Sequence, residues 1–218
     1  MNGVAVVTPW LDHTELWEDY EPAVQEADQL VIVDDGSLVP LEFATTRLDT
    51  NQGFSRACNH GLALVEYDRV VFLNNDVATD DPQWLTRLAD RIEPGVLVGA
   101  KLRTETHAAV RGIQDPLTYL DGWCLGGMVE DFMQLRGWDE GYAEPAYYSD
   151  NDLCLRARCL GMTLRECRVP LHHKLSTTTR PGGGSPNDSV DPHLQGVLTM
   201  NYKRYSERAL LLLASVAA

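Results

Sequence analysis

The feature that most constrains the fold of this chain is a set of short runs of apolar, largely β-branched residues. Each run ends at polar residues. Such runs occupy residues 4–7, 30–33 and 70–73. Continuous apolar runs of this length are typical of strands buried on both faces of a parallel sheet. Because segments with apolar residues at helical spacing alternate with them, we predict an α/β fold with a mixed, mostly parallel central sheet flanked by helices.

The segments between and after these runs predict the remaining elements. Pro22 is unfavourable within the first expected helix, because proline has no backbone N–H to donate. Asp81 is expected to cap the third helix and Pro82 to open it, and Gly161 to end the fifth. The expected helices cover 16–27, 54–65, 82–92, 128–135, 150–160 and a terminal stretch from about 192, and further strands cover 95–100 and 163–169.

Charge and hydropathy exclude several classes of protein. Lys and Arg number 18 against 32 Asp and Glu, a formal net charge of −14, which argues against a nucleic-acid partner bound through many phosphate contacts. The longest apolar run, 209–214, is shorter than a membrane span requires, and residues 1–9 lack the charged region of a signal peptide. We therefore expect a soluble, cytoplasmic protein with no transmembrane segment, which could form a homodimer through its apolar terminal helix.

The polar residues that end the apolar runs are the first candidates for chemistry, because ligands of open parallel sheets bind beyond the carboxyl ends of the strands. No glycine-rich dinucleotide or P-loop motif occurs. A carboxylate can accept hydrogen bonds from a base or ribose, and another can hold Mg²⁺ or Mn²⁺ against a diphosphate. The sequence therefore predicts a nucleoside diphosphate bound through a metal. The residues concerned are Thr8, Pro9, Asp34, Asp35, Asn74, Asn75 and Asp76.

Six segments in order, from about residue 3 to residue 186, resemble the family 2 glycosyltransferases of GT-A fold, particularly the rhamnosyltransferase-like branch. The resemblance implies a single GT-A domain over 1–190, with a nucleotide-binding half (1–103) and an acceptor-binding half (104–190), followed by a C-terminal helical extension (191–218). The segments are Val33-Asp34-Asp35-Gly36-Ser37, Asn51-Gln52-Gly53-Phe54, Phe72-Leu73-Asn74-Asn75-Asp76, Asp121-Gly122-Trp123-Cys124-Leu125-Gly126-Gly127, Gly137-Trp138-Asp139-Glu140 with Ser149-Asp150-Asn151-Asp152, and His173-Lys174-Leu175-Ser176 with 183–186.

The resemblance also implies roles for individual residues. Asp150 would be the general base, and Asp76 with His173 would hold Mn²⁺ or Mg²⁺, His172 being the alternative ligand. Thr8, Pro9, Asp34, Asp35, Asn51, Gly53 and Asn75 would bind the nucleotide. The donor sugar and the acceptor would meet Trp123, Gly126, Gly127, Trp138, Asp139 and Asp152.

The implied reaction is the inverting transfer of a hexosyl or deoxyhexosyl group from a UDP-, dTDP- or GDP-linked donor to an acceptor hydroxyl. The acceptor could be a glycan, a lipid-linked intermediate, a protein or a small molecule. Ser149 stands where the family usually has Glu, and Asn74 replaces the first acid of the DxD-like motif. These departures leave open a catalytically weak or inactive protein that binds a nucleotide sugar or carbohydrate.

Overall fold

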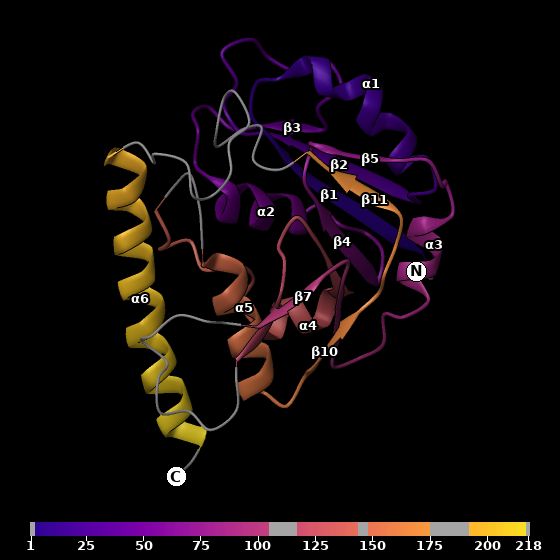
Figure 1. The fold of residues 1–218 in the computed structure, drawn as a ribbon. Helices are drawn as coiled ribbons and strands as arrows, with labels where there is room; N and C mark the ends of the chain where they lie inside the picture. Colours follow the sequence, from indigo (N-terminus) through magenta and orange to yellow (C-terminus); the bar gives the residue numbers. More distant parts are fainter. Residues whose placement is uncertain (1–2, 105–116, 144–147, 175–191, 217–218) are drawn as a thin grey trace.

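The structure is a computed structural model that describes residues 3–104, 117–143, 148–174 and 192–216 (Figure 1). A central seven-stranded sheet has the order β10-β6-β9-β4-β1-β2-β3. Only β9 runs antiparallel to its neighbours, which confirms the mixed, mostly parallel sheet. Its strands are β1 (Val4–Trp10), β2 (Gln29–Asp34), β3 (Thr46–Arg47), β4 (Arg69–Leu73), β6 (Val96–Gly99), β9 (Cys124–Met128) and β10 (Thr163–Glu166).

Helices cover both faces of the sheet. Val6 of β1 packs in a core with α1 and α3, whereas its neighbour Val7 packs in a second core with α2, α4 and α5, because successive side chains of a strand point to opposite faces. This burial on both faces explains why the strand sequences are continuously apolar. The helices are α1 (Trp17–Tyr20), α2 (Phe54–Leu62), α3 (Trp84–Ala89), α4 (Val129–Gln134), α5 (Ser149–Cys159) and α6 (Pro192–Val216).

The first expected helix is interrupted in the structure. Residues 16–27 contain the single turn of α1 between two 3-10 helices, Thr14–Leu16 and Glu21–Val24. Pro22 lies in the second of these, where its missing N–H and fixed φ favour a short turn over a continuous α-helix. The prediction of one helix here was wrong, although Tyr20, Ala23 and Val24 are buried as its apolar face required.

Strand β9 was not expected, because only a helix over 128–135 was predicted after Gly126 and Gly127. Each glycine instead lies in the sheet beside a crowded neighbour. A Cβ on Gly126 would lie 2.9 Å from the Val70 carbonyl oxygen, and one on Gly127 would lie 2.8 Å from Leu97 Cδ2. The two glycines therefore permit close packing in the sheet, and they lie away from solvent.

Two small antiparallel sheets complete the fold, β5 (Val77–Thr79) with β11 (Leu171–His173) and β7 (Leu102–Thr104) with β8 (Thr118–Leu120). The terminal helix α6 runs alongside α5 at one side of the molecule (Figure 1). Across the described part of the chain, no helix is both long and apolar enough to cross a membrane. The glycine-containing motif at 183–186 lies outside the described residues.

Candidate active site

The ends of β1, β2 and β4 bring the first predicted residues to one edge of the sheet. Thr8 is buried in β1, where its hydroxyl hydrogen-bonds the hydroxyl of Tyr20. Pro9 is partly exposed and lies opposite Val33 of β2. Tyr20 was not predicted to contribute here, because a hydrogen bond between residues 12 apart leaves no local sequence pattern.

Asp34 and Asp35 face different partners, although they are adjacent. Asp34 forms an ion pair with Arg47 and accepts the backbone N–H of Ser37 at 2.9 Å and of Leu41 at 3.2 Å. Burial opposes ionisation of Asp34, but these hydrogen bonds prevail, and the net effect lowers its pKa. Its charge is thus compensated within the protein.

The carboxylate of Asp35 orders the loop before α2. It accepts the backbone N–H of Gln52 at 2.7 Å and of Gly53 at 2.8 Å. Burial is the main reason that its pKa is raised. Gly53 has φ of 89° at the start of α2, a backbone conformation that glycine adopts without a Cβ clash. The side chain of Asn51 also accepts the Gly53 N–H, at 3.0 Å.

Asp76 and His173 come together beyond the end of β4. Strand β11 pairs with β5 so that His173 lies opposite Val77, and its Nε2 is 3.1 Å from Asp76 Oδ1. His173 also stacks on Trp123, with ring centroids 4.8 Å apart. His172 points elsewhere: its side chain is 66% exposed and lies 3.4 Å from Asp80. Of the two histidines, His173 therefore belongs to the cluster.

Asn75, between Asn74 and Asp76, is 5% exposed. Its Nδ2 has no hydrogen-bond partner among the described residues. A buried amide donor without a partner costs free energy, so this atom is available to an acceptor oxygen brought by a ligand. The backbone N–H of Asn74 donates to the Trp123 carbonyl at 2.9 Å, and its side-chain Nδ2 lies 3.5 Å from His173 Nε2.

Asp150 lies in the first turn of α5 and is partly buried. Its carboxylate accepts the backbone N–H of Gly122 and of Asn151, both at 3.0 Å. Burial raises the pKa of Asp150 to about 6, and the nearby charge of Asp121 adds to the rise. A carboxylate with this pKa is ionised at neutral pH and is a better proton acceptor than an ordinary aspartate.

The tight turn formed by residues 121–123 connects these groups. The backbone N–H of Gly122 donates to the carboxylate of Asp150, and the ring of Trp123 stacks on that of His173. The carboxylate of Asp121 accepts Arg103 Nε at 2.6 and 2.7 Å and Trp123 Nε1 at 3.3 Å. Asp121 and Arg103 were not predicted as site residues. The adjacency of Asp121 to Gly122 and Trp123 was the available signal.

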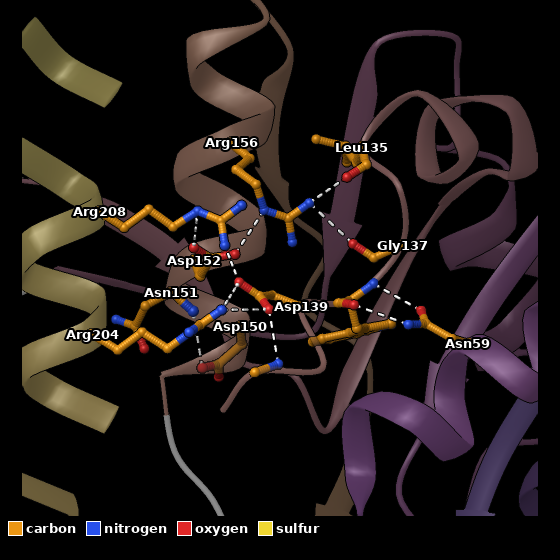
Figure 2. Close-up of polar contacts among 12 residues, drawn as sticks. Asn59, Leu135, Gly137, Asp139, Asp150, Asn151, Asp152, Arg156, Arg204 and Arg208 are labelled. Atoms are coloured by element: carbon orange, nitrogen blue, oxygen red, sulfur yellow. Dashed lines mark hydrogen bonds and ion pairs between the residues drawn. The ribbon is translucent and has the colours of Figure 1, made fainter. Parts of the chain in front are cut away.

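Two of the remaining predicted residues, Asp139 and Asp152, lie in a separate network of ion pairs (Figure 2). Asp152 is fully buried and pairs with Arg156 Nε, four residues further along α5, at 2.7 Å, and also with Arg208 Nε at 3.0 Å. Asp139 pairs with Arg204 at 3.0 Å and with Arg208. Through these ion pairs, the two aspartates bind α6 to α5 and to the loop that follows α4.

Trp138 is 1% exposed and packs edge-on against Phe54 and Phe72. It is a core residue, and neither it nor the glycines of β9 presents a face to solvent. The structure therefore brings together Asp76, His173, Trp123 and Asp150. It places Trp138 in the core and Asp139 and Asp152 in the ion pairs with α6.

Comparison with known proteins agrees with this architecture. Residues 23–108 match the family model described as glycosyl transferase family 2. Among solved structures, the chain is similar to a mannosyltransferase from Pyrobaculum calidifontis in complex with GDP-Man and Mn2+, with a TM-score of 0.57 and 16% identity. Curated proteins give no match.

The similarity covers 75% of this chain and 54% of that mannosyltransferase, so the chain spans about half the length of the structure it matches. The fold is that of the GT-A, Rossmann-like glycosyltransferases. The structural similarity shows the fold, and the family match covers residues 23–108.

Proposed function

We propose that this chain is a metal-dependent, inverting family 2 glycosyltransferase, in which Asp150 is the general base. The observation that carries the proposal is the turn at 121–123, which contacts Asp150 through Gly122 and His173 through Trp123. One short segment thus contacts both the proposed base and the proposed metal site beside Asp76, and it fixes their relative position. Fixed geometry between reacting groups is a main source of catalytic rate.

Asp76 and His173 are the residues proposed to hold Mn²⁺ or Mg²⁺. Their facing atoms, 3.1 Å apart, are about as far apart as neighbouring ligands of one small cation with bonds of about 2.1 Å. No group of three His, Cys, Asp or Glu gathers at a possible metal site in the described residues. Two protein ligands fit a cation that takes its other ligands from diphosphate and water. When bound, such a cation offsets the negative charge of the departing diphosphate.

The nucleotide is proposed to lie along Thr8, Pro9, Asp34, Asp35, Asn51, Gly53 and Asn75. The unpartnered Nδ2 of Asn75 supplies a donor for a ribose or phosphate oxygen. Asp35 acts through the backbone it holds, since it fixes the N–H groups of Gln52 and Gly53. Each carboxylate oxygen retains acceptor capacity beyond one hydrogen bond, so Asp35 can also accept a hydrogen bond from the nucleotide.

In the proposed reaction, Asp150 accepts the proton of the acceptor hydroxyl as that oxygen attacks the anomeric carbon, and the bond to the diphosphate breaks on the opposite face. The Gly122 and Asn151 N–H groups orient the carboxylate. Trp123 provides an aromatic face for the donor sugar. A rhamnosyltransferase-like specificity and a hexosyl or deoxyhexosyl donor are part of the proposal, as is an acceptor hydroxyl on a glycan, a lipid-linked intermediate, a protein or a small molecule.

The test is release of nucleoside diphosphate from UDP-, dTDP- and GDP-sugars with Mn²⁺, Mg²⁺ or EDTA. We expect slow, metal-dependent hydrolysis of one donor, lost in Asp76→Ala. Nucleotide binding is titrated in the same samples, because strict acceptor dependence would suppress release but not binding. Asp80→Ala is the matched control, since Asp80 is 96% exposed and lies beside His172. Absence of both release and metal-dependent binding would contradict the proposal.

A further inference from the structure

A cavity of about 670 Å³ lies between α6, α5 and the loop that follows α4. A second cavity of about 480 Å³ adjoins it, and the two share Asn59 and Glu140. None of Asp76, His173 and Asp150 lines either cavity, so this hollow is separate from the proposed catalytic centre. We call the larger one the arginine cavity, because four arginines line it: Arg136, Arg156, Arg204 and Arg208.

Positive charge exceeds negative charge around the arginine cavity. Each carboxylate there is already paired: Asp139 with Arg204 and Arg208, Asp152 with Arg156 and Arg208, and Glu140 with Arg56 at 3.4 Å. The four arginines of the cavity thus face three carboxylates, Asp139, Glu140 and Asp152, a surplus of one positive charge in a chain whose net charge is −14. A surplus of positive charge on a concave surface of an otherwise acidic chain attracts anions, so this surface favours an anionic partner.

Among the four arginines that line the cavity, Arg136 is the one without an ion pair to a described residue, and it is exposed. Its side chain has no hydrogen bond or ion pair with any residue that the structure describes, and it lines the cavity. Its backbone has φ of 60°, a left-handed conformation that disfavours every residue with a Cβ relative to glycine. A strained arginine where glycine would be more stable is a sign of a functional requirement.

Arg156 adds a second observation. Its side chain is 10% exposed, and Nε and Nη1 are occupied by Asp152 and by the carbonyl of Gly137. Its Nη2 is buried with no hydrogen-bond partner in the described part of the chain. Figure 2 shows the guanidinium among these partners, with one nitrogen bearing no contact. This buried donor is unsatisfied among the described residues, and an oxyanion in the cavity can accept from it only after the cavity wall shifts.

We propose that the arginine cavity binds a phosphate-bearing anion, with Arg136 as its principal contact. A phosphate monoester carries a charge of about −1.5 to −2 at pH 7, opposite in sign to the surplus on the arginines. Guanidinium groups bind phosphate oxygens through paired hydrogen bonds. The same chemistry fits free inorganic phosphate or the phosphate of a sugar phosphate, and the cavity has the size of a small-molecule site.

The test is calorimetric titration with inorganic phosphate in EDTA, so that no metal carries the anion to the sheet edge. We expect saturable binding by the wild type. Arg136→Gly removes the guanidinium and relieves the left-handed backbone, so it should weaken binding by about tenfold or more while the midpoint of urea unfolding stays equal or rises. Arg136→Lys should retain much of the affinity. Arg168→Gln, at a 90% exposed arginine that pairs with Glu166, should bind as the wild type does.

A parallel titration with glucose 1-phosphate distinguishes the sources. Tighter binding than that of inorganic phosphate identifies a sugar phosphate as the ligand, and equal binding identifies the free anion. Absence of saturable phosphate binding by the wild type at concentrations up to roughly 10 mM would overturn the proposal. So would an Arg136→Gly variant that binds phosphate as tightly as the wild type. Because the readout is binding without metal, failure here leaves the proposed transferase activity untouched.

Discussion

The ring of Trp123 stacks on that of His173, with centroids 4.8 Å apart and planes 9° apart. Aromatic contacts of this kind contribute about 0.5–1.5 kcal/mol. Removal of the indole should release the imidazole from its position beside Asp76. We therefore expect Trp123→Ala to weaken Mn²⁺-dependent nucleotide binding by about fivefold, whereas Trp123→Phe, which keeps an aromatic face, stays within about twofold. Equal affinities for the two variants would contradict a positioning role for the stack.

The raised pKa of Asp150 predicts a pH dependence for transfer. Because the base must be ionised, the rate should fall about tenfold per pH unit below pH 6 and level off above pH 7. Asp121→Asn removes a negative charge that helps to raise the pKa of Asp150, so the acidic limb should shift to lower pH. A pH profile of kcat/KM measures this. An unchanged limb in Asp121→Asn would show that the titrating group is not Asp150.

Arg208 bridges Asp152 of α5 and Asp139 of the preceding loop. Arg208→Gln leaves the fully buried Asp152 with Arg156 alone, and we expect a loss of about 1–2 kcal/mol in the free energy of unfolding. Lys203→Gln on the same helix is the control, because Lys203 is 77% exposed and its nearest acid, Glu207, is 3.9 Å away. That change should stay within about 0.5 kcal/mol. Urea unfolding measures both, and similar losses would contradict the assigned role of Arg208.

Gly137 and Gly161 both have positive φ, 67° and 80°, but their surroundings differ. A Cβ on Gly137 would lie 2.3 Å from Asn59 Oδ1, and one on Gly161 would meet nothing within 4 Å. Gly161→Ala should cost only the backbone conformational term, about 1 kcal/mol. Gly137→Ala should cost at least about 2 kcal/mol more, because it also disturbs the hydrogen bonds between Asn59 and Trp138. Equal unfolding midpoints would contradict this account.

Much of the sheet was predictable, because strands buried on both faces leave continuous apolar runs. Strand β9 was not predictable. Its two glycines are needed because Val70 of β4 and Leu97 of β6 leave no room for a Cβ, and both of those strands are distant in sequence. The polar ends of β1, β2 and β4 were predictable as one edge for the same topological reason. A strand can thus be predicted from the sequence when burial makes it continuously apolar, but not when its residues depend on contacts with distant strands.

The contacts of the candidate site also fall into two groups, those with a local sequence signal and those that depend on tertiary packing. The Asp152–Arg156 pair has i,i+4 spacing, which sequence reveals, and His173 was placed by its motif. The pairing of Asp139 with Arg208, 69 residues apart, leaves no local signal. It depends on how α6 docks, which is a property of packing. Trp138 was expected at the acceptor but is buried, because a motif tryptophan does not reveal whether its ring faces a ligand or the core.

The central claim is that Asp150 is the base of a transfer reaction. Its most direct test compares Asp150→Asn with the wild type in donor binding and in turnover, using the donor that the release assay identifies. Asn151→Asp, a change of the neighbouring side chain, serves as the control for local charge. We predict that Asp150→Asn keeps the donor affinity within about twofold and loses at least about a hundredfold in kcat, the range that general base catalysis supplies. Unchanged turnover would contradict the claim.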